Sequence, residues 1–433
     1  MAAHAVTGSR PTPDPDPEPA AREPADGTPK VFLHIGEPKT GTTSLQQVMW
    51  RNRAELAAQG VVLPGHHPQD HFRASQDLRG VPKLASDPAG SWTGEWEILA
   101  RQAQQAPKTA VISHELFSAA DAEQADRAVR SLLPAEVHVV LTVRDMATLL
   151  PAEWQETVKH RNTRGFQDWL GDVIDRESVS DNRRQWWFWR VHDTLAILDL
   201  WSRHVPPERV HVIITPPRGS DGALLWQRFA SLLGVDPGRV DLSRARPNAS
   251  LGLPEIEFLR RLNQALPADV PDWFYMWNVK EAVAHRALAA RPRSGPLVLP
   301  PDREAWARAQ ADQLVAGLAD SKYDIVGDLG ELVPRPSGAA AISPENEPAE
   351  QVLAAAVDAA AALVVNQYRK EFPAAKPQGS GQRGLVGRVE STVAASPRLK
   401  RTVRELSSRS VAVRRLRILA WRALERNRAG KHS

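Results

Sequence analysis

Four short apolar runs alternate with helical patterns along this 433-residue chain, and this alternation limits the folds it can adopt. Each run is rich in valine, isoleucine or leucine and is bounded by proline, glycine or charged residues. The runs are KVFLHI, TAVIS, VHVVLTV and RVHVIIT, at 30–35, 109–113, 137–143 and 209–215. Runs that are apolar on both faces are typical of buried parallel strands covered by helices. The sequence therefore predicts an α/β fold, with a parallel sheet flanked by helices.

The first run leads into a glycine turn and then into a helix. The stretch VFLHIGEPKTGTTSLQQ covers 31–47, and apolar residues recur at helical spacing from Leu45 to Leu56, just before Gly60. A loop that leaves a parallel strand and enters a helix directs backbone N–H groups, and the positive end of the helix dipole, at one point. We therefore expect a phosphate site at this turn.

The turn differs from a nucleoside-triphosphate loop in the position of its lysine. That loop reads G-x-x-x-x-G-K-[ST], with the lysine directly after the second glycine. Here Thr42 follows Gly41, and Lys39 lies three positions before Thr42. Gly36 and Gly41 permit a tight turn, and Lys39 can reach an oxygen that joins a phosphate to a leaving group. We expect an intact loop for a donor other than a magnesium-bound triphosphate.

The segment PKTGTTSL resembles the 5′-phosphosulfate loop of bacterial sulfotransferases that use 3′-phosphoadenylyl sulfate (PAPS). The resemblance covers about 30–335 and implies a P-loop NTPase-like sulfotransferase fold. It also implies that Lys39 is the catalytic cation and that PAPS is the co-substrate, with no metal required. The cofactor-binding residues that it implies are Gly36, Lys39, Thr40, Gly41, Thr42, Thr43, Ser44 and Arg144.

Arg144 carries the second part of the resemblance, because it follows the third apolar run in VHVVLTVRD. In the family, an arginine at this place binds the 3′-phosphate of the donor. Many members also have a serine eight residues further on, where this chain has Ala152. Either another group completes the 3′-phosphate site, or the register of the helix differs.

Two candidate bases, His114 and Glu115, follow the second run in TAVISHELF. The acceptor hydroxyl or amine has to lose a proton, and family members use a histidine or glutamate just after this strand. Open α/β sheets bind ligands at the carboxyl ends of their strands. We expect the pair to form part of the site, and the sequence does not choose between its two members.

These features predict a sulfotransferase that acts on a small-molecule, glycan or glycolipid acceptor, whose identity the sequence does not reveal. One alternative is a small-molecule kinase, which requires a lysine after Gly41 that this chain lacks. Another is a non-catalytic nucleotide-binding module, and the departure at Ala152 supports it. No nucleic-acid partner is expected. Since the chain has no cysteine, disulfides, thiolate metal sites and thiol catalysis are excluded.

The predicted domain, at 30–375, lies between two segments of different composition. Residues 1–29 alternate proline with acidic residues and lack the apolar core of a signal peptide, which predicts a disordered tail and a cytoplasmic protein. Residues 376–433 form a basic extension that begins with a linker-like segment. No apolar run approaches the length of about 18 residues that a membrane span needs.

Charge is divided unevenly between the domain and the basic extension. In 376–433, 15 lysines and arginines face three glutamates, which gives +12 and leaves about −8 for the rest of a chain of net charge +4. Within the extension, 411–428 places apolar residues on one helical face and arginines on the other. This pattern predicts a basic amphipathic helix that either packs on its own domain or contacts an anionic membrane surface.

Overall fold

The computed structural model describes residues 27–82, 92–175, 183–243, 250–292, 295–335 and 343–371. The predicted acidic tail, apart from its last three residues, lies outside this part of the chain. The basic extension 376–433, with the predicted helix 411–428, lies outside it as well. The predictions for both segments therefore stay predictions.

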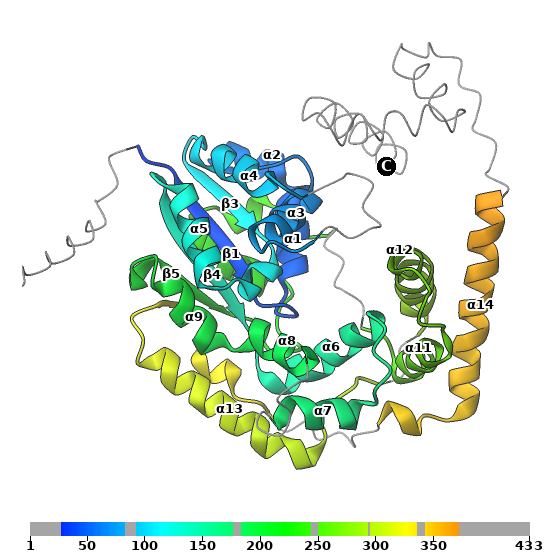
Figure 1. Cartoon of the computed structure of the whole chain (residues 1–433). Coiled ribbons are helices and arrows are strands. Elements are labelled where there is room, and N and C mark those ends of the chain that lie inside the picture. Colours follow the sequence, from blue (N-terminus) through cyan, green and yellow to red (C-terminus); the bar gives the residue numbers. More distant parts are fainter. Residues whose placement is uncertain are drawn as a thin grey trace, which may run out of the picture.

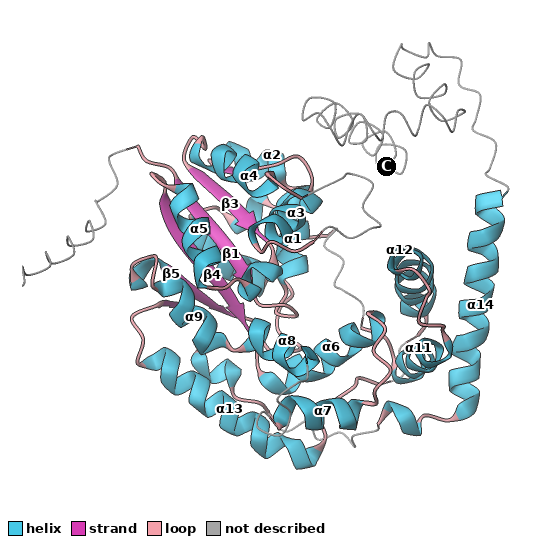
Figure 2. Cartoon of the chain, viewed as in Figure 1, coloured by secondary structure: helices cyan, strands magenta, loops and turns pink. Residues whose placement is uncertain are grey.

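The described residues form a six-stranded parallel sheet, with helices on both sides, which confirms the predicted α/β fold (Figure 2). The order of the strands is β2-β3-β1-β4-β5-β6. All four apolar runs are strands, whereas the edge strands β2 and β6, of two and three residues, are too short to leave a pattern in the sequence. The strands are β1 (Lys30–Gly36), β2 (Val61–Val62), β3 (Thr109–Ser113), β4 (Glu136–Val143), β5 (Val210–Ile214) and β6 (Asp324–Val326).

The two faces of the sheet carry separate apolar cores. Val31, Leu33 and Ile35 of β1 belong to the core beneath α3, α4, α5 and α9, whereas Phe32 belongs to the core beneath α1, α2 and α10. This alternation follows from the period of two in a strand. The helices are α1 (Thr42–Arg51), α2 (Arg53–Ala58), α3 (Pro68–Leu78), α4 (Glu95–Gln104), α5 (Ala122–Leu132), α9 (Thr194–Ser202) and α10 (Leu224–Leu233).

The helical pattern that was predicted to run up to Gly60 is divided into two helices at Asn52. The Asn52 amide donates to the carbonyl oxygen of Val48 at 2.9 Å and to that of Asp241 at 3.0 Å. Asparagine side chains that bond to nearby backbone compete with the helix. The side-chain contacts of Asn52 therefore account for the break.

A third apolar core lies among helices away from the sheet. Figure 1 shows α11, α12 and α14 on the far side of α6 from the strands. The helices of this core are α6 (Met146–Lys159), α7 (Phe166–Ile174), α8 (Arg183–His192), α11 (Leu253–Ala265), α12 (Asp272–Tyr275), the π-helix η4 (Met276–Ala287), α13 (Pro301–Ala319) and α14 (Ala349–Glu371). Short 3-10 turns complete the described elements: η1 (Glu115–Ala119), η2 (Pro207–Arg209), η3 (Pro237–Arg239), η5 (Leu288–Ala290), η6 (Leu329–Leu332) and η7 (Pro344–Asn346).

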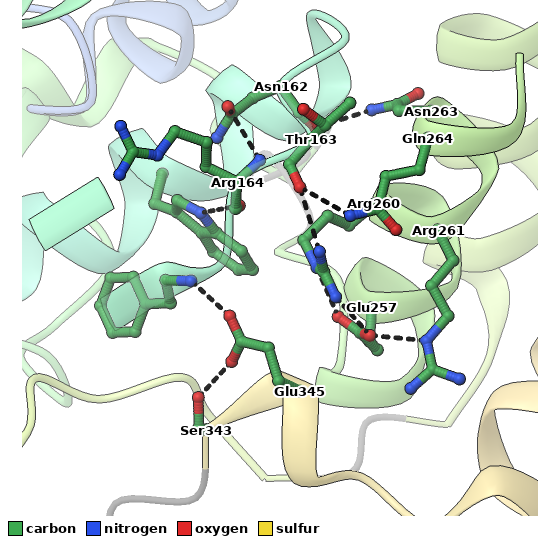
Figure 3. Close-up of polar contacts among 12 residues, drawn as sticks. Asn162, Thr163, Arg164, Glu257, Arg260, Arg261, Asn263, Gln264, Ser343 and Glu345 are labelled. Carbon is green, nitrogen blue, oxygen red and sulfur yellow. Dashed lines mark hydrogen bonds and ion pairs between the residues drawn. The ribbon is translucent and has the colours of Figure 1, made fainter. Parts of the chain in front are cut away.

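A polar network attaches the loop after α6 to α11 (Figure 3). Arg260 and Gln264 both donate to the carbonyl oxygen of Thr163, at 3.0 and 3.1 Å. Asn263 donates to the carbonyl oxygens of Val158 and Asn162, at 2.7 and 3.1 Å. These bonds satisfy backbone acceptors at the end of α6 and fix the position of its last turn.

Helix α14 meets the length and hydropathy of a membrane span over Ala349–Arg369, at a mean hydropathy of 1.4. This resemblance to a membrane span rests on the length and composition of the helix alone. In the structure, Val352, Ala355 and Ala359 are buried, and α14 packs on α11 and η4. Leu353 and Val364, by contrast, are 64% and 69% exposed.

Candidate functional site

The candidate site lies at the carboxyl ends of β1, β3 and β4. Strand β1 is central and pairs with β3 on one side and β4 on the other. After β1 the chain continues through α1 to β2 on one side of the sheet, and after β4 it continues through α6 to β5 on the other side. Connections that diverge in this way open a crevice at the carboxyl ends of the two strands.

The loop between β1 and α1 needs glycine at both of its ends. Gly36 has φ of 140°, and a Cβ there would lie 3.0 Å from the carbonyl oxygen of Glu115. Gly41 has φ of 94°, and its Cβ would come within 2.3 Å of Leu225 Cδ2. A larger residue at either position would face both backbone strain and a collision. Both ends of the turn therefore need glycine, and Lys39 lies between the two glycines at φ of 62°.

The hydroxyl residues of the loop differ in what they contact. Thr40 is buried, and its hydroxyl donates to the carbonyl oxygen of Glu37 at 2.6 Å. Thr215 in turn donates to the carbonyl oxygen of Thr40 at 2.8 Å. Since the Thr40 side chain holds the loop together, its predicted role in phosphate binding rests on its backbone N–H. Thr42 is also buried.

Thr43 and Ser44 lie in the first turn of α1 and are half-buried. Gly41 is the N-cap residue and provides no side-chain cap for this turn. The first N–H groups of a helix have no acceptor within the helix, and the helix dipole adds positive potential there. This turn can therefore donate backbone hydrogen bonds to an anion.

Lys39 points from the loop toward α6. Its Nζ lies 2.8 Å from Oε2 of Glu156, and the Lys39 side chain is 21% exposed. Burial disfavours its charge, but attraction to Glu156 and Glu153 outweighs burial and raises the pKa of Lys39. Lys39 is therefore a protonated cation at neutral pH, as its predicted role requires.

Arg144 lies at the end of β4 and contacts the loop directly. Its Nη1 donates to the carbonyl oxygen of Lys39 at 3.0 Å. Burial, and then the nearby charge of Arg218, lower the pKa of Arg144, although Asp145 acts in the opposite direction. Arg218 is exposed in the segment after β5, and Ala152 is half-buried in α6. Arg218 is therefore a second cation whose charge acts on Arg144. Sequence reasoning missed it because one exposed arginine resembles another.

His114 is the N-cap residue of η1, where its Nδ1 accepts a hydrogen bond from the backbone N–H of Leu116 at 3.2 Å. Burial lowers the pKa of His114, so the ring is neutral at pH 7. A neutral imidazole that accepts at Nδ1 carries its proton on Nε2. This form of His114 has no second lone pair with which to take a proton.

Glu115 is the better placed of the two candidate bases. Its Oε2 accepts a hydrogen bond from the amide of Gln46 at 3.2 Å. Burial would raise the pKa of Glu115, but the combined effects of His114, Gln46 and Lys39 lower it. The carboxylate is therefore ionised at neutral pH and lies near enough to Lys39 for the two charges to interact. The geometry favours Glu115 over His114.

Glu156 gathers basic side chains that sequence reasoning missed. Its two carboxylate oxygens lie 2.8 Å from Lys39 Nζ, 3.6 Å from Lys159 Nζ, 2.8 Å from Lys280 Nζ and 3.2 Å from His160 Nε2. Burial acts to raise the pKa of Glu156, but the charges of the three lysines and a hydrogen bond with His160 hold it well below its usual value. Because the residues come from the loop, α6 and η4, no local spacing in the sequence indicated the group.

A buried histidine, His192, contacts Glu37 in the loop between β1 and α1. His192 ends α8, and its Nδ1 lies 3.5 Å from Oε2 of Glu37. Its Nε2 lies 3.7 Å from Oε2 of Glu153. Thr194 donates to the other oxygen of Glu37 at 2.5 Å. Burial opposes a charge on His192, but Glu153 and Glu37 outweigh burial and raise its pKa to about 9.

The raised pKa of His192 predicts that the protein loses stability as the pH rises from about 6.5 to 9. A group whose pKa is higher in the folded state stabilises it fully below the unfolded pKa, and this stabilisation is lost as pH rises through the folded pKa. From 6.5 to about 9, the expected loss is roughly 3 kcal/mol in the free energy of unfolding. Urea unfolding curves recorded at a series of pH values between 6.5 and 9 measure this loss.

The matched control for this titration is His192→Gln, which removes the titrating ring but keeps a polar side chain. This variant should be less stable at pH 6.5 and should lack the pH-dependent step. If wild type and variant showed the same slope between pH 6.5 and 9, another group would be responsible.

A cavity of about 440 Å³ opens beside His192, between α8 and α13. Met146, Trp189, Thr194 and Trp306 are among the residues that line it, whereas Lys39 and Glu115 do not. A smaller space lined by Glu37 and Arg144 shares Met146, His192 and Thr194 with it. The cavity therefore approaches the loop from the side of α13.

The chain matches no protein-family model and no curated protein. Among solved structures, it is similar to a sulfotransferase from Alicyclobacillus acidocaldarius, with a TM-score of 0.33 and 16% sequence identity. The match covers 54% of this chain and 92% of that chain. A likeness of this degree does not show the activity of this chain.

Proposed function

We propose that the protein is a sulfotransferase that moves a sulfuryl group from PAPS to the hydroxyl or amine of an acceptor. The observation that carries this proposal is that Lys39, Arg144 and Glu115 follow the ends of three adjacent strands. Lys39 and Glu115 provide a cation and a base whose charges interact. Arg144 provides a second cation in contact with the same loop.

In the proposed reaction, Glu115 takes the proton of the acceptor as a new bond forms between the acceptor atom and sulfur. The bond from sulfur to the oxygen of the 5′-phosphate breaks, and its electron pair stays on that oxygen. Lys39 stabilises this developing negative charge, because a fixed cation in a partly dry site acts without reorganisation. The products are the sulfated acceptor and adenosine 3′,5′-bisphosphate.

In the proposed complex, the loop and the two arginines bind different phosphates of the donor. The glycine turn and the first turn of α1, with Thr43 and Ser44, suit the 5′-phosphate. Arg144 and Arg218 suit the 3′-phosphate. The kinase alternative is less well supported, because Thr42 is buried where a triphosphate loop needs a lysine directed at the phosphates.

PAPS and adenosine 3′,5′-bisphosphate are expected to raise the melting temperature of the protein without magnesium. A ligand that binds the folded state stabilises it by mass action, by about 2.7 kcal/mol at 100 times its dissociation constant. ATP with magnesium should raise it far less. Differential scanning fluorimetry with each ligand measures this order, and the reverse order would favour the kinase alternative.

The acceptor is proposed only as a class: a small molecule, a glycan or a glycolipid. Incubating the full chain with labelled PAPS and an extract of its host would reveal an acceptor as a compound that gains the mass of SO₃. A protein that binds PAPS firmly yet labels no compound in such an extract would instead be a nucleotide-binding module.

A further inference from the structure

A cationic cluster lies beside the proposed transfer site. It consists of Lys39, Lys159 and Lys280, whose ammonium groups surround the carboxylate of Glu156 within 3.6 Å. The side chains of Lys159 and Lys280 are only 9% and 14% exposed. The two lysines are therefore largely withdrawn from water, unlike lysines on a solvated surface.

More ammonium groups than carboxylates lie in contact at Glu156. Three ammonium groups lie within 3.6 Å of its single carboxylate. Glu153 and Glu115 also attract Lys39, but Glu153 is paired with His192 as well. Burial, and then the repulsion of Lys39 and Lys280, lower the pKa of Lys159. Like charges held together in a partly dry site destabilise one another unless an opposite charge is added. The cluster can therefore accept a second anionic group.

Separate elements hold the cluster in place. Lys159 is the last residue of α6, where Asn263 of α11 fixes the preceding carbonyl oxygen of Val158 at 2.7 Å. Lys280 lies on η4, and its Nζ is 2.6 Å from Nε2 of His160. A site assembled from two helices and braced by a third keeps its charges in position before a ligand arrives.

We propose that Lys159 and Lys280 bind an anionic group of the acceptor, a phosphate, sulfate or carboxylate, next to the atom that receives the sulfuryl group. Lys39 places this subsite, because it contacts the same carboxylate as Lys159 and Lys280 and also belongs to the donor loop. The assignment of the ligand to the acceptor rests on the proposed sulfotransferase function. It narrows the acceptor to molecules that already carry a negative charge.

Calorimetric titration with inorganic phosphate tests the subsite directly. The full chain is first saturated with adenosine 3′,5′-bisphosphate, so that the donor site is filled, and phosphate is then added. Phosphate should bind, and Lys159→Gln with Lys280→Gln should weaken this binding about tenfold or more, since charge-assisted hydrogen bonds are lost. The bisphosphate affinity should change less than threefold. Each single variant, checked by circular dichroism, serves if the double variant does not fold.

Two further variants sharpen the test. Lys322→Gln removes the same charge from an exposed position and should leave phosphate binding unchanged. Glu156→Gln removes the competing carboxylate and should tighten phosphate binding. Unchanged binding by the lysine variants, or by Glu156→Gln, would overturn the inference.

The same titration distinguishes an error in the proposed function from an error in the proposed anion subsite. If bisphosphate excluded phosphate, the cluster would belong to the donor site, and the inference would be wrong while the proposed function stood. If bisphosphate did not bind at all, the proposed function would fail. Phosphate binding that depended on Lys159 and Lys280 would then still establish an anion site, but not an acceptor subsite, so this part of the inference would fail with the function.

Discussion

Replacing Lys39 with alanine is expected to lower turnover by about 10²- to 10³-fold, the usual loss when one preorganised electrostatic donor is removed. The fold should stay intact, because the charged end of Lys39 contacts Glu156 and not the apolar core. Glu156 also keeps Lys159 and Lys280 as partners in the variant. Transfer of label from PAPS, measured at saturating donor and acceptor, gives the change in turnover.

The matched control for Lys39 is Lys322→Ala, which removes an exposed lysine outside the site. It should retain full turnover and an unchanged melting temperature. Full activity in Lys39→Ala would exclude Lys39 from the mechanism. A Lys39→Ala protein with an unchanged melting temperature and low turnover would separate a chemical role from a structural one.

Replacing Glu115 with glutamine should lower turnover by about 10²-fold or more, since general base catalysis contributes on this scale. The substitution keeps the shape of the side chain and removes its charge. In the wild type, activity should fall at acid pH as Glu115 becomes protonated. Because the pKa of Glu115 lies below its ordinary value of 4.5, this fall should begin only in acid well below pH 7. The pH dependence of turnover in both proteins measures the effect.

His114→Gln is the comparison that decides between the two candidate bases. Its turnover should stay within a few-fold of wild type, because the ring caps η1 and its Nδ1 already accepts a hydrogen bond. A large loss in His114→Gln, with Glu115→Gln nearly unaffected, would assign the base to His114.

The sheet could be predicted because its four longer strands are apolar on both faces, and runs of this kind, bounded by turn residues, are typical of buried parallel strands. Strands β2 and β6 could not be predicted, since two or three residues carry no period. The helical core around α6, α11 and α14 was also missed as a unit. Its helices show apolar spacing, but spacing does not tell which helices pack together.

The loop, Arg144 and Glu115 could be placed from the sequence because each follows directly on a predicted strand, and parallel strands end at a common edge. Lys159 and Lys280 were missed for the opposite reason. They lie on helices, far apart in the chain, and meet only after α6 and η4 have packed together. The contact of His192 with Glu37 joins residues 155 positions apart, so no local pattern could indicate it.

The contact between Lys39 and Glu156 means that the protein carries its own exchangeable counter-ion. In the proposed reaction, an incoming donor would have to replace a carboxylate that already lies 2.8 Å from Lys39, so weakly held ions such as chloride would compete poorly for the loop. The same carboxylate would contact Lys39 again once the sulfuryl group had moved, which would help the nucleotide product to leave. We therefore expect weak inhibition by adenosine 3′,5′-bisphosphate, together with a lower affinity for PAPS than a loop without this carboxylate would have.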